Sequence, residues 1–379
     1  MSTHHSIPSS SERLLSTGLG ALLAARSWDR SWTGTLLGAA LVFRGLSGYC
    51  PVYQKLAQLR EHDALNDQVA LVTGGSRGLG LCLVEELASR GARVAFCART
   101  PDTVETTENQ LRERGYDVRG YVCDVAHREQ VHAMMARIRS ELGTVRILVN
   151  NAGIIKVAPL EALTEKDFHE CLNVNFWGIL NTCLEALPDL KAQGGRILNI
   201  TSLSGKMPAP HLLAYNCAKA AAVALSEGLT LELDRCGITV TTAVPGLMRT
   251  GSHVNARFGG DAESEYAWFS RAAVHPALAA DSRRAAHDFV EAALAGKPEI
   301  LYGWEPTLGT RFHALFPGLN LRLNRLIQRL LPEPSHQPVR SAGRQLRPLK
   351  PMGSRLEPFE RQALERLQGL VSGDEPTGG

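Results

Sequence analysis

Short apolar runs alternate with helix-length segments through the middle of the chain, from about residue 63 to residue 305. The runs are four to seven residues of nearly continuous apolar character: 68–73, 93–98, 145–150, 196–201 and 238–244. Such runs suit strands that a parallel sheet buries on both faces. Between them lie segments with helical patterns, for example 79–91 and 127–143. The alternation predicts an α/β fold with a doubly wound parallel sheet.

The first zone, residues 1–62, contains two apolar stretches, Leu14–Ala25 and Ser31–Phe43, rich in Gly, Ala and Leu. Each is shorter than the roughly 18–20 residues that cross a bilayer alone. Small residues are typical of packed membrane helices, and Trp28 and Trp32 beside charged residues are typical of an interface. We expect a helical hairpin associated with a membrane. The alternative is a soluble amphipathic hairpin that packs on the rest of the chain or on a partner subunit.

The third zone, residues 306–379, begins with an amphipathic helical pattern over residues 319–331. One face of this helix carries Leu319, Leu323, Leu326, Ile327 and Leu330, and the other carries Arg322, Arg325 and Arg329. The apolar face either docks on the core or a dimer partner, or lies on an anionic membrane surface. The remainder is rich in Pro, Ser and Arg and predicts an extended, flexible tail.

Composition narrows the class of protein. Of 379 residues, 44% are hydrophobic and 21% charged, as in a globular chain with a core. The net charge of +3 gives no reason to expect a nucleic-acid partner. The eight cysteines form no C-x-x-C pair and the twelve histidines no H-x-x-x-H pair. We therefore expect a reduced compartment, no disulfide framework and no metal site.

A glycine-rich turn, Thr73–Gly80, joins the first predicted strand to a helix. Such a turn lets the backbone approach a pyrophosphate closely, and the helix start offers unpaired N–H groups to the phosphates. A Cβ atom at Gly74, Gly78 or Gly80 would obstruct this approach. At the first strand–helix turn of an alternating pattern, the cluster predicts a dinucleotide site rather than a turn that binds nothing.

Two arginines bear on the choice of cofactor. The second strand ends at Ala98 and Arg99, where an NAD-selective site usually has an acidic residue for the ribose hydroxyls. A carboxylate would repel a 2′-phosphate, whereas a guanidinium pairs with it. Arg77, in the glycine loop, can face the same phosphate. We expect NADP(H) in preference to NAD(H); the alternative is that both arginines are solvated surface charges.

Tyr215 and Lys219 lie four residues apart in a long helical pattern, so their side chains share one face. A free tyrosine titrates near about 10, and a neighbouring ammonium lowers that pKa toward neutrality. Ser202 ends a predicted strand thirteen residues earlier, and its hydroxyl can donate a hydrogen bond to a substrate carbonyl oxygen. Ser204 is a rival for this role. The three groups favour acid–base chemistry at a carbonyl.

Together these residues resemble the short-chain dehydrogenase/reductase family in its single-domain form, with a three-layer αβα Rossmann fold. Thr73–Gly80 matches its T-G-x-x-x-G-x-G loop, and Asn150–Gly153 matches its N-N-A-G motif. Asp124 and Val125 match the pair that contacts adenine. Pro245–Gly246 and Thr250 match the P-G motif and the threonine near the carboxamide.

The resemblance implies four catalytic residues. Tyr215 is the general acid in reduction and the base in oxidation, and Lys219 lowers its pKa and binds the nicotinamide ribose. Ser202 orients the carbonyl, and Asn175 holds a water that relays protons. The cofactor contacts implied are Gly74, Ser76, Arg77, Gly78, Leu79, Gly80, Arg99, Asp124, Val125, Asn151, Ala152, Gly153, Tyr215, Lys219, Pro245, Gly246 and Thr250.

The N-terminal zone has a resemblance of its own, to a small bacterial inner-membrane hairpin domain that is sometimes fused to enzymes. Gly48, Cys50, Pro51 and Tyr53 carry it. If the hairpin inserts, two crossings leave both termini, and the catalytic domain, on the cytoplasmic side.

The segment from Leu247 to Pro276 should form a substrate lid. Its aromatic residues indicate an apolar substrate or form the core of the lid itself: Phe258, Tyr266, Trp268 and Phe269. His211, near the expected mouth of the cleft, is expected to be a surface histidine rather than a substrate contact.

Three functions remain open. The first is an NADP(H)-dependent oxidoreductase for a hydrophobic alcohol and its ketone or aldehyde, held at a membrane. The second is a cytoplasmic enzyme whose extra segments mediate oligomerisation. The third is a catalytically silent nucleotide-binding regulator or scaffold, against which the complete set of four catalytic residues argues. By resemblance, a homo-oligomer is expected.

Overall fold

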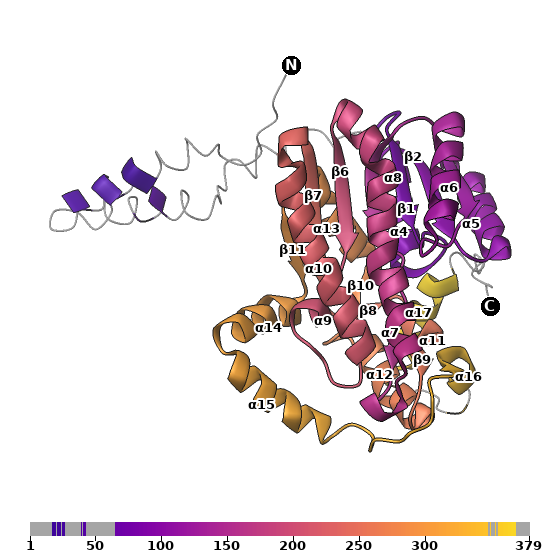
Figure 1. Ribbon diagram of the computed structural model, residues 1–379, viewed down its shortest axis with the longest axis vertical. Coiled ribbons are helices and arrows are strands. Elements are labelled where there is room, and N and C mark those ends of the chain that lie inside the picture. Colours follow the sequence, from indigo (N-terminus) through magenta and orange to yellow (C-terminus); the bar gives the residue numbers. More distant parts are fainter. Residues whose placement is uncertain are drawn as a thin grey trace, which may run out of the picture. The chain divides into compact units, whose positions relative to one another are not determined.

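The computed structural model describes residues 65–347 continuously. It also describes residues 17–19, 21–23, 25–26, 39, 41–42, 349, 353 and 355–368. The chain divides into two units, residues 1–64 and 65–379, and the fold below is that of the second unit (Figure 1). The predicted N-terminal hairpin lies largely outside the described residues. Among the helices that the structure describes, none is both long enough and apolar enough to cross a membrane.

The centre of the fold is a sheet of seven parallel strands, in the order β11-β7-β6-β4-β1-β2-β3. Its strands are β1 (Val69–Thr73), β2 (Arg93–Ala98), β3 (Val118–Val122), β4 (Val145–Asn150), β6 (Gly195–Ile200), β7 (Ile238–Pro245) and β11 (Glu299–Tyr302). The predicted parallel sheet is confirmed. The strand order reverses between β1 and β4, and the carboxyl ends of parallel strands leave a crevice at such a point.

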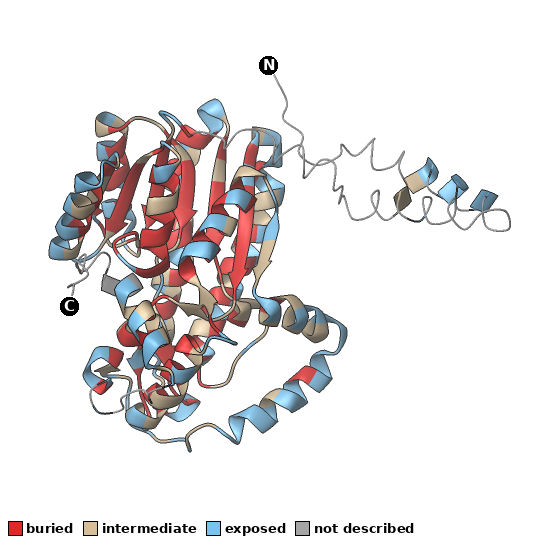
Figure 2. Ribbon diagram, turned by 180° about the vertical axis from the view of Figure 1, so that it is seen from behind, coloured by how far each residue is buried: buried red, intermediate tan, exposed pale blue. Residues whose placement is uncertain are grey.

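Helices cover both faces of the sheet (Figure 1). They are α4 (Gly78–Ser89), α5 (Pro101–Glu113), α6 (Arg128–Glu141), α8 (Gly178–Gln193), α10 (Leu213–Leu233) and α13 (Ser282–Leu294). Alternate strand residues enter two cores: Ala70 and Val72 pack with α4, α5 and α13, whereas Val69 and Leu71 pack with α6, α8 and α10. The expected three-layer αβα arrangement is therefore present, and Figure 2 shows its buried centre.

Smaller elements gather beyond the carboxyl ends of the strands. The helices are η1 (Leu160–Ala162), α7 (Glu165–Leu172), α9 (Leu203–Lys206), α11 (Ser252–Asn255) and α12 (Ala262–Val274); η3 (Asp234–Cys236) ends α10. The short strands are β5 (Lys156–Val157), β8 (Met248–Arg249), β9 (Arg257–Phe258), β10 (Ala280–Asp281) and β12 (Ser341–Ala342). They pair as β12-β9-β5 and β10-β8. A separate core of lid residues lies among them.

The C-terminal part adds α14 (Trp304–Leu315), α15 (Pro317–Gln328), α16 (Gly343–Leu346) and α17 (Glu357–Gln368). The amphipathic helix expected over 319–331 corresponds to α15. The chain after it differs from the expected free tail: β12 pairs with β9, and α17 packs on α4 and β8. Arg249 Nε donates a hydrogen bond of 2.9 Å to Gln362 Oε1, which fastens α17 to this end of the fold.

Candidate active site

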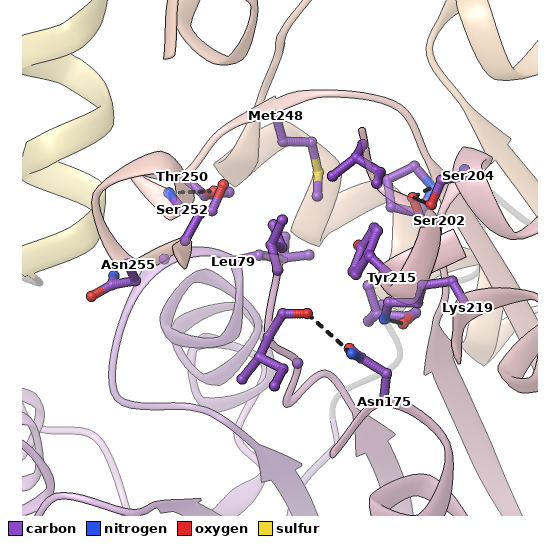
Figure 3. Close-up of a pocket in the computed structure, with 18 of the residues that line it drawn as sticks. Leu79, Asn175, Ser202, Ser204, Tyr215, Lys219, Met248, Thr250, Ser252 and Asn255 are labelled. Carbon is purple, nitrogen blue, oxygen red and sulfur yellow. Dashed lines mark hydrogen bonds between the residues drawn. The ribbon is translucent and has the colours of Figure 1, made fainter. Parts of the chain in front are cut away.

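A cavity of about 640 Å³ opens at the carboxyl ends of β1, β4, β6 and β7 (Figure 3). Every residue that the sequence predicted for catalysis or for cofactor contact lines it. The structure thus brings together motifs that are up to 176 residues apart in the chain, since Gly74 and Thr250 share the cavity. Among the described residues, no group of three or more His, Cys, Asp or Glu has the geometry of a metal site.

The glycine loop lies against the N-N-A-G motif. Thr73 Oγ1 accepts hydrogen bonds of 3.0 Å from the N–H groups of both Asn151 and Ala152. The amide of Asn151 donates in return to the carbonyls of Thr73 and Gly74, at 3.0 and 3.2 Å. These bonds fix the end of β4 to the end of β1. A Cβ atom at Gly80 would lie 2.1 Å from the carbonyl oxygen of Gly74, so only glycine permits this closeness.

The loop leads directly into the start of α4. Gly74 and Gly78 have φ angles of +65° and +58°, a region that side chains rarely adopt. The cap residue of the helix, Arg77, makes no side-chain hydrogen bond to the helix start. The first N–H groups of α4, including that of Leu79, are therefore available to an anion, and Ser76 lies beside them on the cavity wall. Such a cradle fits the diphosphate of a dinucleotide.

The remaining predicted cofactor contacts lie in the segments that follow β3, β4 and β7. The amide of Asn181 donates to the carbonyl of Val125 at 3.0 Å, which holds the backbone that follows Asp124. Gly246 donates to the carbonyl of Tyr302 at 3.2 Å, directly after Pro245. Thr250 Oγ1 accepts from the N–H of Ser252 at 3.3 Å.

Three arginines surround the outer end of this site. The side chain of Arg99 is 56% exposed, and its Nη1 lies 4.0 Å from Asp124 Oδ2. Partial desolvation, followed by the charges of Arg344 and Arg99, lowers the pKa of Arg77. Arg344 belongs to α16, and the sequence offered no signal for it, because the return of the C-terminal chain to this site is a long-range contact.

The predicted catalytic groups converge on the opposite wall (Figure 3). Ser202 lies two residues after the end of β6 and caps α9, and its Oγ accepts from Ser204 N at 3.2 Å and from Ser204 Oγ at 3.1 Å. Ser202 and Tyr215 both line the cavity, and the hydroxyl of Ser202 acts to lower the pKa of the Tyr215 phenol. Lys219 lies one turn further along α10, with Nζ 5.8 Å from the centre of the Tyr215 ring and 2.9 Å from the carbonyl of Ile200.

Burial dominates the titration of this pair. It raises the pKa of the Tyr215 phenol to about 12, and the hydrogen bond from Ser202 only partly opposes it. Burial also lowers the pKa of Lys219 to about 8. The sequence predicts the reverse direction for Tyr215, from the ammonium alone. The difference arises because both side chains are removed from water, which disfavours the charged form of each.

Asn175 lies in η2 (Asn173–Trp177), a π-helical turn between α7 and α8. Its Nδ2 donates to the carbonyls of Ile154 and Cys171, each at 3.0 Å. Its Oδ1 is buried and has no hydrogen-bond partner among the residues that the structure describes. A Cβ atom at Gly153 would lie 2.7 Å from that oxygen. A buried amide oxygen of this kind fits the expected role of holding a water molecule.

The lid divides its aromatic residues between two uses. Trp268 and Phe269 line the cavity, and the core of the lid buries Phe269 together with Phe258 and Tyr266. His211 is not on the surface as expected: it is buried, and its Nδ1 lies 2.6 Å from the buried carboxylate of Glu265. Further residues line the cavity that no sequence motif marks: Met207, Pro208, Leu212, Met248, Asn255, Asn324, Ile327 and Leu331.

Comparisons with known proteins agree with this arrangement. A protein of Streptomyces violaceoruber, described as ketoacyl reductase 1 of the granaticin polyketide synthase, is 38% identical over 185 residues, which cover 48% of this chain and 68% of the relative. A 3-oxoacyl-acyl-carrier-protein reductase of Haemophilus influenzae is 32% identical over 187 residues, or 49% of this chain and 76% of the relative.

A crystal structure of a gluconate 5-dehydrogenase from Burkholderia cenocepacia, in complex with NADP and tartrate, has 28% identity and a TM-score of 0.57. The match covers 65% of this chain and 98% of that one. The family model described as short chain dehydrogenase matches residues 68–258. This stretch holds the glycine loop, the N-N-A-G motif and all four predicted catalytic residues, and the chain belongs to the short-chain dehydrogenase/reductase family of NAD(P)-dependent oxidoreductases.

Proposed function

We propose that this oxidoreductase uses NADP(H) to interconvert a hydrophobic alcohol and its ketone or aldehyde. The observation that carries the proposal is the presence of Ser202, Tyr215 and Lys219 at the wall of a cavity that also contains the glycine cradle. When bound, the cofactor supplies or accepts the hydride at its nicotinamide ring.

The side chains supply positioning and proton transfer. Ser202 Oγ donates a hydrogen bond to the substrate carbonyl oxygen, and the Tyr215 hydroxyl gives its proton to the same oxygen during reduction. A pKa of about 12 keeps the phenol protonated at neutral pH, as an acid requires. In oxidation the Tyr215 phenol first releases its proton to solvent through Lys219 and the water held by Asn175. The phenolate then removes the proton from the alcohol.

The cavity wall supports an apolar substrate. The lid contributes Trp268 and Phe269, the loop before α10 contributes Met207 and Leu212, and α15 contributes Ile327. These apolar side chains lie in the same cavity as Ser202 and Tyr215. Removal of hydrophobic surface from water would then contribute much of the binding free energy of the substrate.

The preference for NADP(H) rests on Arg77, Arg99 and Arg344. Desolvation, and after it repulsion from Arg344 and Arg99, lowers the pKa of Arg77, and a bound 2′-phosphate would offset this repulsion. The gluconate 5-dehydrogenase that resembles this chain was crystallised with NADP, which is consistent with the same preference here.

We also propose that residues 1–62 associate with a membrane, with the catalytic domain facing the cytoplasm. Fractionation of cells that express the chain with and without these residues tests this; recovery of both forms in the soluble fraction would support the cytoplasmic alternative. A homo-oligomer formed through α8 and α10 is supported by the exposed Leu184 and Leu231.

A panel of hydrophobic ketones and aldehydes, followed by NADPH absorbance, tests the activity. We expect turnover with NADPH in preference to NADH, and a loss on the order of a thousandfold in Tyr215→Phe, which keeps the ring but not the proton. Cofactor affinity, measured by NADPH fluorescence, should persist in this variant. Near-wild-type turnover of Tyr215→Phe would exclude the mechanism. NADPH binding without turnover of any carbonyl would favour a silent nucleotide-binding regulator.

A further inference from the structure

The helices α14 and α15 are largely exposed (Figure 2), and many of their exposed residues are large and apolar. On α14, Trp304, Leu308 and Leu315 lie at positions i, i+4 and i+11, which places them on one face, and each is more than half exposed. Phe316, between the two helices, is 53% exposed. Apolar side chains this exposed and this close together mark a surface that meets an apolar partner.

On α15 the usual arrangement of an amphipathic helix is inverted. Asn320 is the only buried residue of this helix, and its Nδ2 lies 3.2 Å from Met207 Sδ. Asn324, one turn later, donates to the carbonyl of Pro208 at 3.4 Å. The polar side chains thus face the fold. A stripe of leucines at i, i+4, i+7 and i+11 is 44% to 86% exposed: Leu319, Leu323, Leu326 and Leu330. The expectation that this stripe docks on the core is therefore wrong.

The charges beside this stripe are all positive. From Pro306 to Pro332 the sequence has no Asp or Glu, but it has Arg311, Arg322, Arg325 and Arg329. On a helical projection the last three form a row beside the leucine stripe. All three are exposed, and none has an ion-pair partner among the described residues.

The same helix borders the entrance to the cavity. Asn324, Ile327 and Leu331 line the cavity, at positions i, i+3 and i+7 on one face of the helical segment. The exposed leucine stripe lies next to this face. A molecule held against the leucines is therefore close to the wall that leads to Ser202 and Tyr215.

We propose that the exposed apolar and arginine residues of α14 and α15, the α14–α15 surface, bind an anionic lipid bilayer. The leucines enter the boundary of the acyl chains while the arginines pair with lipid phosphates. A second copy of this chain fits the surface less well, because a two-fold contact would bring the arginine rows together without a carboxylate in either segment. As an extension that rests on the proposed function, a hydrophobic substrate passes from the bilayer into the cavity along α15.

Hydrogen exchange of the full chain tests the lipid contact, because it reports on each segment separately and so distinguishes α14–α15 from residues 1–64. The probes are vesicles of phosphatidylcholine alone and vesicles with about one third phosphatidylglycerol. We expect protection of residues 304–331 on the anionic vesicles, and little on the neutral ones.

Two variants locate the contact. Arg322→Gln/Arg325→Gln/Arg329→Gln should weaken vesicle binding by this segment on the order of ten- to a hundredfold, and Leu323→Ser/Leu326→Ser should abolish its protection. The matched control is Arg112→Gln/Arg128→Gln/Arg137→Gln, which removes three exposed arginines from α5 and α6 and makes the same change in net charge. It should bind as the unmodified chain does.

The proposal would be overturned if anionic vesicles did not change hydrogen exchange in residues 304–331. It would also be overturned if vesicles protected only residues 1–64. A leucine variant whose mass in sedimentation without lipid falls to that of a smaller oligomer would instead assign the surface to a second copy. Turnover of a water-soluble ketone should be the same in all variants, because none of the substituted residues lines the cavity. If the proposed function is wrong, neither the unmodified chain nor any variant will turn over the ketone. This outcome does not depend on whether vesicles protect residues 304–331.

Discussion

At the scale of single residues, desolvation controls the chemistry of Tyr215 and Lys219. At the wall of the cavity Tyr215 is partly buried and Lys219 is buried. Loss of water around them favours the neutral form of each group, so the pKa of the phenol rises and the pKa of the amine falls. Lys219 gains one hydrogen bond, to the carbonyl of Ile200. Burial of the Lys219 amine lowers the free energy of unfolding. The size of this loss depends on pH, because the pKa of the amine differs between the folded and unfolded chain.

Replacement of Lys219 by Met should stabilise the fold at neutral pH. The pKa of Lys219 falls from 10.5 to about 8 on folding. Between these values the unfolded chain holds a proton that the native chain has released, so the stability of the unmodified protein rises with pH through this window; below pH 8 both forms are protonated and the penalty is constant. Lys219→Met should therefore add about 3 kcal/mol at pH 7, and less above pH 8. Urea unfolding at several pH values measures this, and a Lys219→Met variant less stable at pH 7 would contradict it.

Arg99 should determine cofactor selectivity. Arg99→Asp replaces a guanidinium with a carboxylate that repels a 2′-phosphate and can bind ribose hydroxyls. We expect kcat/KM with NADPH to fall on the order of a hundredfold, with little loss for NADH. Arg112→Asp, at an exposed site on α5, is the matched control and should leave the ratio unchanged. An unchanged ratio in Arg99→Asp would show that Arg99 does not meet the phosphate.

At the scale of elements, a buried hydrogen-bonded group joins the lid helix α12 to the loop before α10. Glu265 is fully buried; one carboxylate oxygen lies 2.6 Å from His211 Nδ1, and the other accepts from Trp268 Nε1 at 2.7 Å. His211 has a φ angle of +59°, which is uncommon for a residue with a side chain. These contacts fix Trp268 where it lines the cavity.

Removal of the Glu265 carboxylate should loosen the lid. Glu265→Ala leaves the indole N–H of Trp268 and the buried His211 Nδ1 without their shared partner, so we expect a loss of about 3 kcal/mol in the free energy of unfolding. Because Trp268 lines the cavity, KM for a hydrophobic ketone should rise more than kcat falls. Denaturant unfolding and steady-state kinetics measure both effects. Glu263→Ala, an exposed position on the same helix, should change neither, and equal behaviour of the two variants would argue against a role for this group.

At the scale of the whole molecule, the C-terminal chain returns to the end of the fold that holds the site. The N–H of Gly343 donates to the carbonyl of Ala256 at 3.0 Å, and Arg347 Nε donates to Glu360 Oε1 at 2.8 Å. Through α16 and α17 this segment supports the chain around Thr250 and brings Arg344 close to Arg77.

Deletion of residues 337–379 should therefore affect both stability and cofactor binding. We expect Tm to fall by roughly 5 °C, because β12, α16 and α17 are lost from β9, α11 and α4. KM for NADPH should rise, since Arg344 is removed. Deletion of residues 369–379 alone is the control and should leave both values unchanged, because it retains every contact described above. Thermal unfolding and steady-state kinetics of the two truncated forms measure Tm and KM. Equal values for both forms would contradict a role of residues 337–368 in stability and cofactor binding.

The sequence by itself determined the parts of this protein that depend on neighbouring residues. Continuous apolar runs identified five of the central strands, because strands buried on both faces cannot be polar. The glycine loop and the Tyr215–Lys219 spacing depend only on a turn and on one helical turn, so their placement followed from local geometry. The apolar pattern did not predict the edge strands β3 and β11, because they are partly exposed and lack a continuous apolar run.

Only the tertiary structure decided which distant groups meet and which leave water. Burial reversed the expected direction of the Tyr215 pKa, and a long-range contact brought Arg344 to Arg77. It also turned the asparagines of α15 toward the fold and left its leucines exposed. Periodicity shows that a helix has two faces, but the side that meets the fold depends on the shape and polarity of the surface it packs against, and that surface is assembled from residues far away in the chain.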